Sequence, residues 1–335
     1  MTPPVRPRLL LIIGVLAALL ALPGAAAAGN GGFGPTSPAS PNAEGIATSF
    51  WFVTALVLGV FLLVETLLVV FVVRFRRRRR PRDADGPQIH GSNRLELAWT
   101  AGPVLILFAI AVFVFAKLPG IIDSPDATAS GGPLRIEVVG HQFYWQFRYP
   151  NGVIAIDRMR APAGRPVVLD VTAPDWDVNH SWWIPRLGGK IDAIPGRMNT
   201  TWFRANEPGF YEGRCAELCG AFHAKMLTGV EVLPQADFDE WLTAAFSAQH
   251  QADPALGREL WEGVCAKCHG LAAEGGYGPT LAAATLTNRD ALETVIRNGR
   301  ALPGRNVMPP VGRDWTAAQL ESLYAYLEAE FGSQG

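Results

Sequence analysis

Three long apolar runs crowd the first 118 of the 335 residues, and they constrain the fold more than any other feature. The second and third runs, Thr48–Val73 and Leu97–Leu118, are each long enough to cross a bilayer core, which takes about 20 helical residues. Seven arginines lie between them, at positions 74–82, and loops this positive stay on the cytoplasmic side. We therefore expect a two-helix transmembrane hairpin, with residues 119–335 on the outer face.

The first run, Leu9–Leu22, has the pattern of a secretory signal peptide. Two arginines precede it, and Pro23-Gly24 and a run of alanines follow, which predicts cleavage near Ala28. An uncleaved membrane anchor is the alternative. Residues 29–47, rich in Gly, Pro, Ser and Asn, would then form a leader. Either alternative leaves the rest of the chain on the outer side, so the predicted orientation is the same.

Charge is unevenly distributed along the chain. Outside the arginine cluster, 30 acidic residues outnumber 22 basic ones, although the net charge of the whole chain is only −1. An acidic exterior suits a basic protein partner, and it argues against binding to nucleic acid.

The segment from Leu134 to Leu233 alternates short strand-like runs with turns. Pro150-Asn151-Gly152 is a strong hairpin signal between two of these runs. Short strands at this spacing predict an all-β sandwich or barrel. The runs richest in β-branched and aromatic residues are Leu134–Val139, Gln142–Tyr149, Val153–Met159 and Val167–Thr172.

Within this β-rich segment, the run Cys215-Ala-Glu-Leu-Cys219-Gly-Ala-Phe-His223-Ala-Lys-Met226 holds four metal-binding side chains, and His180 lies upstream. Two thiolates, imidazole and a thioether form a soft ligand set that favours copper. Three alternatives stay open: a zinc site, which has little use for a methionine, a Cys215–Cys219 disulfide, and a histidine that only fills the core.

A second cysteine pair, in Cys265-Ala-Lys-Cys268-His269, matches the attachment signature of a c-type haem. His269 is placed to be the proximal axial ligand, and Met308 lies downstream where a methionine axial ligand belongs. A thioredoxin-like redox pair is the alternative, but the βαβ pattern that it requires is missing. The sequence therefore predicts covalently bound haem c.

The residues around this signature resemble the class I cytochromes c over about 80 positions, which implies an all-α domain. Gly257 would let two helices cross closely, and Thr316-Ala-Ala-Gln319 predicts a capping box at the start of the last helix. The Pro279 carbonyl is expected to accept a hydrogen bond from His269 and so orient its ring.

The β-rich segment is similar to the copper domain of cytochrome c oxidase subunit II, a cupredoxin. The resemblance rests on His180-Ser-Trp182, on Lys190-Ile-Asp-Ala-Ile-Pro-Gly-Arg197 and on the run from Cys215 to Met226. It implies two copper ions that are bridged by both cysteines and capped by both histidines. The full implied copper set is His180, Cys215, the Glu217 carbonyl, Cys219, His223 and Met226, with the Glu217 side chain directed at a magnesium ion shared with subunit I.

The resemblance also covers two positions outside the copper set. Glu96, at the start of the second span, matches a residue at the entrance of a proton channel in subunit I; the alternative is an interfacial charge that suits the helix dipole. Phe143 replaces the tryptophan through which the family receives electrons from external cytochrome c. This replacement suits a chain that receives electrons from its own attached cytochrome.

Together with these patterns, the resemblance implies a multidomain subunit of a caa-type haem–copper oxidase in the bacterial plasma membrane, with its copper and haem domains outside. Its partners would be oxidase subunit I, other oxidase subunits and an external donor such as a cytochrome. The alternatives are the electron-input subunit of a nitric-oxide-reducing relative, or a membrane-tethered copper/haem sensor or copper-handling protein. The expected segments are 1–28 signal peptide, 29–47 leader, 48–118 hairpin, 119–235 cupredoxin domain, 236–253 helix and linker, and 254–335 cytochrome c domain.

Overall fold

The computed structural model describes residues 34–75, 88, 90–124, 132–300 and 308–332. Its contacts divide the chain into two units, Met1–Ser37 and Pro38–Gly335, and every helix and strand below belongs to the second. The predicted signal peptide lies outside the described residues, as does the arginine cluster except for Arg74.

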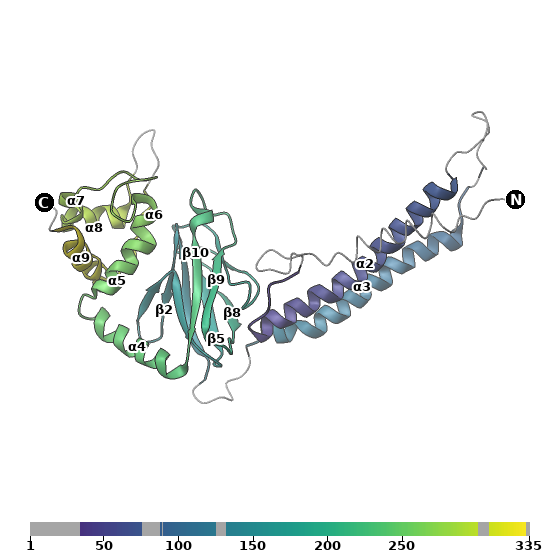
Figure 1. Ribbon diagram of the computed structural model, residues 1–335, viewed down its shortest axis with the longest axis horizontal. Helices are drawn as coiled ribbons and strands as arrows, with labels where there is room; N and C mark the ends of the chain where they lie inside the picture. Colours follow the sequence, from purple (N-terminus) through teal and green to yellow (C-terminus); the bar gives the residue numbers. More distant parts are fainter. Residues whose placement is uncertain (1–33, 76–87, 89, 125–131, 301–307, 333–335) are drawn as a thin grey trace. The chain divides into compact units, whose positions relative to one another are not determined.

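Two long helices, α2 (Pro41–Phe75) and α3 (Asn93–Ile122), run side by side in opposite directions (Figure 1). The rings of Phe52 and Phe113 stack between them with their centroids 4.0 Å apart. The most apolar stretch of 18 residues has a mean hydropathy of 3.0 in α2 and 2.5 in α3, and no part of either stretch is buried. Both helices are thus long and apolar enough to cross a membrane, which agrees with the predicted spans.

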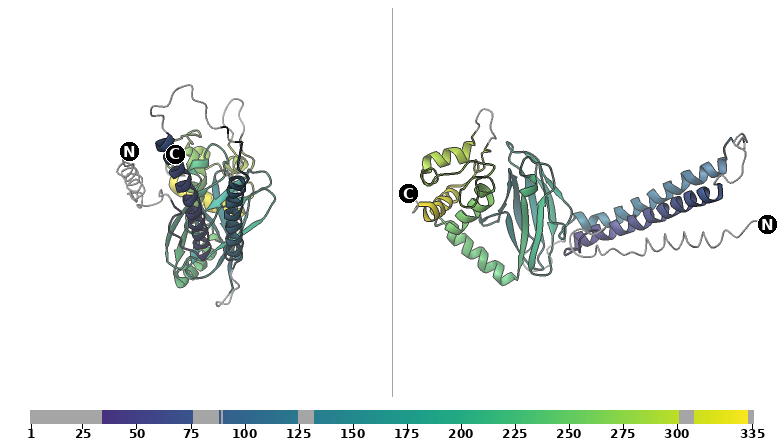
Figure 2. Two further views of the ribbon diagram at one scale, coloured as in Figure 1. Left: turned by 90° about the vertical axis from the view of Figure 1, so that its right-hand side faces the viewer. Right: turned by 45° about the horizontal axis from the view of Figure 1, so that its top comes forward.

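Residues 134–233 fold into a β-sandwich domain of two five-stranded sheets that face each other (Figure 2). Large apolar side chains such as Trp145, Phe147 and Leu169 fill the space between the sheets and are fully buried. The first sheet has the order β3 (Ile154–Ile156), β2 (Tyr144–Arg148), β1 (Leu134–His141), β5 (Val167–Thr172) and β8 (Asn199–Phe203). The second has the order β4 (Arg158–Pro162), β10 (Leu227–Leu233), β9 (Gly209–Cys215), β6 (His180–Trp183) and β7 (Ile191–Ala193).

The expected strands and hairpin are found, with one exception. Gly152 adopts a positive φ of 89° and donates to the Tyr149 carbonyl, which closes the predicted hairpin turn. The prediction of one strand over Val153–Met159 was wrong, because the chain breaks at Asp157, whose φ is 57°. β3 ends before this residue in one sheet, and β4 begins after it in the other.

The C-terminal residues 254–332 form a helical domain, reached through α4 (Gln235–Gln249). Gly257 lies where a Cβ atom would come within 2.0 Å of the Ser322 carbonyl oxygen, which confirms that this glycine permits a close helix crossing. Thr316 and Gln319 form the predicted capping box. The domain comprises α5 (Pro254–Leu260), a π-helical turn (Trp261–Cys265), α6 (Ala266–His269), α7 (Ala283–Leu286), α8 (Arg289–Asn298) and α9 (Ala317–Phe331).

The edge strand β3 is covered by polar side chains from the C-terminal segment. Gln249, at the end of α4, accepts from the Ile154 amide at 3.0 Å and donates to the Ile154 carbonyl at 2.8 Å. Glu259 of α5 accepts from the Ile156 amide at 3.4 Å. These contacts satisfy outward-facing backbone groups that an open sheet edge would leave for another chain to pair with.

Candidate copper and haem centres

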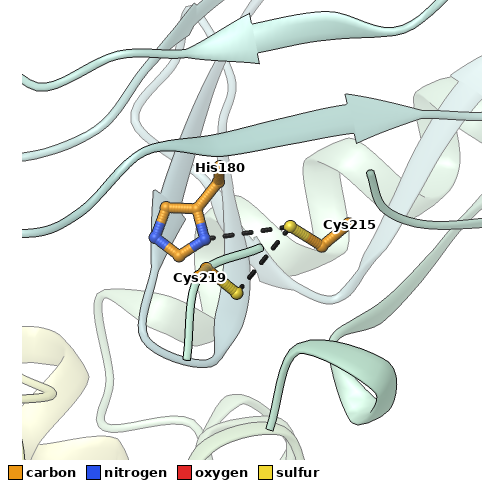
Figure 3. Close-up of side chains that lie close together, drawn as sticks. All are labelled: His180, Cys215 and Cys219. Carbon is orange, nitrogen blue, oxygen red and sulfur yellow. Dashed lines mark hydrogen bonds between the residues drawn. The ribbon is translucent and has the colours of Figure 1, made fainter. Parts of the chain in front are cut away.

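Six groups that the sequence analysis singled out lie together at one end of the second sheet. The Cys215 and Cys219 sulfurs are 3.9 Å apart, and the Cys215 sulfur is 4.0 Å from Nδ1 of His180 (Figure 3). On the other side, the Cys219 sulfur lies 3.7 Å from Nδ1 of His223 and 3.7 Å from the Met226 sulfur. The Glu217 carbonyl oxygen is 3.2 Å from the Cys215 sulfur.

Adjacent strands explain why these residues meet. β6 pairs with β9 in antiparallel register, so that His180, at the start of β6, lies near Cys215, at the end of β9. The chain then loops through Cys219 and a short 3₁₀ turn at His223 before β10 begins after Met226. Gly140 leaves room for the imidazole, because a Cβ atom there would lie 3.1 Å from the His180 ring.

The donor chemistry of this cluster fits copper. Soft thiolate and thioether ligands together with imidazole are the set that copper prefers. Two thiolates 3.9 Å apart can both reach an ion placed between them, since metal–thiolate bonds are about 2.3 Å long in zinc sites of similar ligands. All four cysteines are free, so the disulfide considered from the sequence is not formed.

Asp177 lies next to the cluster and contacts the ring of His180, a role that the sequence did not predict. One of its carboxylate oxygens lies 3.2 Å from Nε2 of His180, which leaves Nδ1 directed at Cys215. Burial alone would lower the pKa of His180, but the hydrogen bonds to Asp177 and Cys215 outweigh burial and raise it. A carboxylate on the far nitrogen fixes the ring orientation of a metal-binding histidine.

The two thiols are strongly coupled. The hydrogen bond between the two sulfurs lowers the pKa of Cys215 to about 3, and the same interaction raises the pKa of Cys219 well above its usual range. Because a thiol must lose its proton to bind a metal, copper binding would depend on pH.

Two acidic residues with predicted roles lie apart from the buried ligands. The Glu217 carboxylate is 3.8 Å from Nζ of Lys190, and the side chain is 44% exposed. Lys190 also bonds Asp192 at 3.1 Å, so Glu217 belongs to a small charged group at the surface. Glu96 lies in the first turn of α3.

The helical domain encloses a cavity of about 930 Å³ beside the C-x-x-C-H motif. This volume lies within the ~300–1,000 Å³ of typical cofactor pockets, and the lining is mainly apolar. Cys265, Cys268, His269 and Met308 all contribute to its wall, so the structure brings the four predicted haem ligands to one space. The residues present fit a covalently attached haem.

The histidine of the motif is oriented as expected. Nδ1 of His269 lies 2.8 Å from the Pro279 carbonyl oxygen, which confirms the predicted hydrogen bond and leaves Nε2 free for iron. Burial raises the pKa of Cys265 to about 12 and raises that of Cys268. A thioredoxin-like pair needs a lowered thiol pKa, so this environment argues against that alternative.

The cavity is completed by residues of the β-sandwich domain. Gln142, Phe143 and Ala221 line it together with the residues of the helical domain. Nε2 of Gln142 also donates to the Cys219 carbonyl oxygen at 2.6 Å. One side chain thus contacts both the haem cavity and the backbone of a candidate copper ligand, a link that the sequence alone did not reveal.

Comparison with known families gives three matches along the chain. Residues 28–116 match the family model described as cytochrome c oxidase subunit II, transmembrane domain. Residues 152–233 match cytochrome c oxidase subunit II, periplasmic domain. Residues 252–327 match the model for cytochrome c oxidase, cbb3-type, subunit III.

Individual proteins similar to this chain include two named cytochrome c oxidase subunit 2. The chain is 35% identical over 305 residues to cytochrome c oxidase subunit 2 of Alkalihalophilus pseudofirmus, covering 83% of this chain and 87% of that protein. It is 34% identical to the Synechocystis subunit 2 over 248 residues, covering 62% of this chain and 74% of that one. The solved periplasmic domain of the Bradyrhizobium japonicum subunit is 34% identical, with a TM-score of 0.32, covering 33% of this chain and 92% of that one.

These matches confirm the predicted oxidase subunit over the sensor and copper-handling alternatives, and they imply copper and haem as cofactors and other oxidase subunits as partners. With two apolar helices, a periplasmic β-sandwich domain and a cytochrome c-like helical domain, the chain belongs to the cytochrome c oxidase subunit II family and carries a fused cytochrome c domain.

Proposed function

We propose that this chain relays electrons from an external donor, through haem c and a binuclear copper centre, to subunit I, where oxygen is reduced and protons are pumped. The observation that carries the proposal is the position of Gln142. Its side chain lines the haem cavity and donates to the Cys219 carbonyl at 2.6 Å. The candidate haem and copper residues therefore lie in contact through a single side chain.

In the copper centre, Cys215, Cys219, His180 and His223 would hold two ions, with Met226 and the Glu217 carbonyl as weaker ligands. Bound copper would supply one-electron transfer. The protein excludes water from the centre, since His180, both cysteines and Met226 are buried, and Asp177 fixes the His180 ring.

In the helical domain, the thiols of Cys265 and Cys268 would hold the haem covalently, and His269 and Met308 would bind its iron. The Pro279 carbonyl orients His269 for this role, because it accepts a hydrogen bond from Nδ1–H and so directs Nε2 toward the cavity.

Two further roles concern subunit I. Glu217 would contribute a carboxylate to a magnesium ion shared with that subunit, supported by a side chain that is 44% exposed beside the buried copper ligands. Glu96 would lie at the entrance of a proton channel, supported by its place in the first turn of α3. The chain would cross the bacterial plasma membrane at least twice, with its copper and haem domains on the periplasmic side.

The test is to purify the assembled complex and to measure oxygen consumption with reduced cytochrome c as donor. We expect cyanide-sensitive turnover, a haem c absorption spectrum and a copper signal with two ions per chain. A complex that binds copper and haem but consumes nitric oxide and not oxygen would contradict the proposal.

A further inference from the structure

Tyr144 of the β-sandwich domain is anchored in the core of the helical domain. It is fully buried and packs with Ile154 and Ile156 against apolar side chains of the C-terminal helices. Its hydroxyl donates to the Val311 carbonyl at 2.6 Å and accepts from the Trp315 indole at 3.0 Å. A side chain that is bonded on both sides inside another domain favours a fixed contact over a transient one.

Lys267, between the two cysteines of the haem motif, reaches into the β-sandwich domain. Its Nζ lies 2.5 Å from the Asp157 carboxylate and donates to the Phe143 carbonyl at 2.9 Å. The two charged side chains are only 16% and 22% exposed. The other carboxylate oxygen of Asp157 accepts from the Trp145 amide, so the acceptor itself is held rigidly. An ion pair this sheltered is screened weakly by salt.

The close approach of the two domains also depends on Gly263. A Cβ atom there would lie 2.6 Å from Cγ2 of Ile156 and 3.2 Å from the Asp157 carboxylate. Alanine is otherwise favourable in a helical turn, so the glycine is required by the neighbouring domain.

We propose that the helical domain is fixed on the β-sandwich domain through Tyr144 and a Lys267–Asp157 latch, so that the turn at Gln142 and Phe143 is covered by the chain's own cytochrome. The meaning of the latch for electron transfer rests on the proposed function, but the docking itself does not.

The experiment compares full-length complexes carrying the parent sequence and Asp157→Asn. Asparagine also tolerates a positive φ and can still accept from Trp145, but it removes the charge opposite Lys267. Single-residue hydrogen exchange reports docking at the Ile156 amide, and tetranitromethane reports access to the Tyr144 ring. We expect exchange at Ile156 to quicken by at least about tenfold and Tyr144 to become nitrated, while amides in the central strands β1 and β5 are unchanged.

Gly263→Ala adds a methyl group to the same interface from the side of the helical domain. It should also quicken exchange at Ile156 and expose Tyr144 to nitration. Arg258→Met is the matched control, because Arg258 forms an exposed ion pair with Glu262 within one helix of the same domain. Tyr144 that reacts at the same rate in all four proteins would overturn the proposal, as would nitration that is already complete in the parent. Haem content, read from the absorption spectrum, shows that each variant is loaded. Because neither readout depends on turnover, inactive complexes would contradict the proposed function and not the docking.

Discussion

The Cys215 sulfur lies at the centre of the copper cluster, within 4.0 Å of both Cys219 and His180. Cys215→Ser would replace a soft thiolate, proposed to bridge two copper ions, with a hard oxygen, so we expect nearly complete loss of the binuclear copper signal. Haem c should remain, because its attachment uses separate residues in another domain. Metal analysis, electron paramagnetic resonance and the haem spectrum measure this outcome. Glu217→Gln, which leaves the ligand carbonyl in place, is the control; equal loss of copper and haem in a folded Cys215→Ser protein would argue against separate sites.

The burial of His141 predicts that the β-sandwich domain loses stability in acid. Burial lowers its pKa from 6.5 to about 4, and nearby Asp177 offsets only part of this. The folded state thus binds fewer protons than the unfolded state between these values. The part of the unfolding free energy that depends on the neutral His141 ring is fully present above about pH 6.5. It decreases as the pH falls toward 4, by about 3 kcal/mol in all. His141→Phe keeps a ring against Tyr144, whose centroid lies 4.6 Å away, and should flatten this part of the pH profile.

Thermal unfolding followed by near-ultraviolet circular dichroism between pH 7 and 4.5 measures the effect. His250→Gln serves as the control, since His250 is exposed. If the parent and His141→Phe lose stability with the same slope, other groups dominate the acid response.

At the scale of single residues, the sequence identified the candidate ligands but not the side chains that support them. Two cysteines, a histidine and a methionine within twelve positions carry their own chemistry, and so does the C-x-x-C-H motif. Asp177 and Lys267 are ordinary charged residues whose roles depend on partners brought near by the fold. The only local sign that Asp177 contacts the His180 ring is its position three residues before that histidine.

Among the secondary-structure elements, the crossing of α5 and α9 depends most on one residue. A Cβ atom on Gly257 would lie 2.0 Å from the Ser322 oxygen and 2.7 Å from its carbon, and backbone cannot turn aside as a side chain can. We expect Gly257→Ala to destabilise the helical domain by about 3 kcal/mol or more, through overpacking. Gly332→Ala, where nothing lies within 4 Å, should change stability by less than about 0.5 kcal/mol.

The melting temperature of the haem-loaded chain, followed at the haem absorption band, compares the two alanine variants. Equal melting temperatures would show that the helices can separate at little cost.

Strand and helix positions followed closely from residue patterns, and the one wrong strand is instructive. Five of the seven residues of Val153–Met159 are apolar and three of these are β-branched, which is typical of one strand. The break at Asp157 is a change of backbone conformation, stabilised by contacts with Trp145 and Lys267 that lie far away in the sequence. Local patterns cannot report a bend that distant partners stabilise.

For the whole molecule, the route of electron entry can be tested by truncation. Ending the chain after Gln251 keeps α4 and the Gln249 cover of Ile154, but it removes the haem domain. We expect oxidation of external cytochrome c by the assembled complex to slow by at least about tenfold while copper stays bound. The expectation follows from Phe143, which replaces the tryptophan of the family's entry site, and from the high local concentration of a linked donor, about millimolar for short linkers.

Oxygen consumption and copper content of the truncated and full-length complexes measure this outcome. Equal turnover would mean that the fused domain is not the entry point. Loss of copper would show instead that the β-sandwich domain needs its neighbour to fold.

The three-part organisation was predictable because each part has a distinct signature: long apolar runs, alternating strands and a haem motif. The contact between the two outer domains was not. Tyr144 reads as an ordinary strand residue, and nothing local indicates that its hydroxyl bonds Val311 and Trp315, more than 160 positions away.

The cover over β3 has an evolutionary consequence. A chain that lost its C-terminal segment would expose the edge of β3 together with Tyr144 and Ile156, and an apolar open edge is a template for aggregation. These side chains stay out of water only as long as the helical domain covers them. Solubility therefore favours the fused form of this chain, even where a separate cytochrome could deliver the electrons.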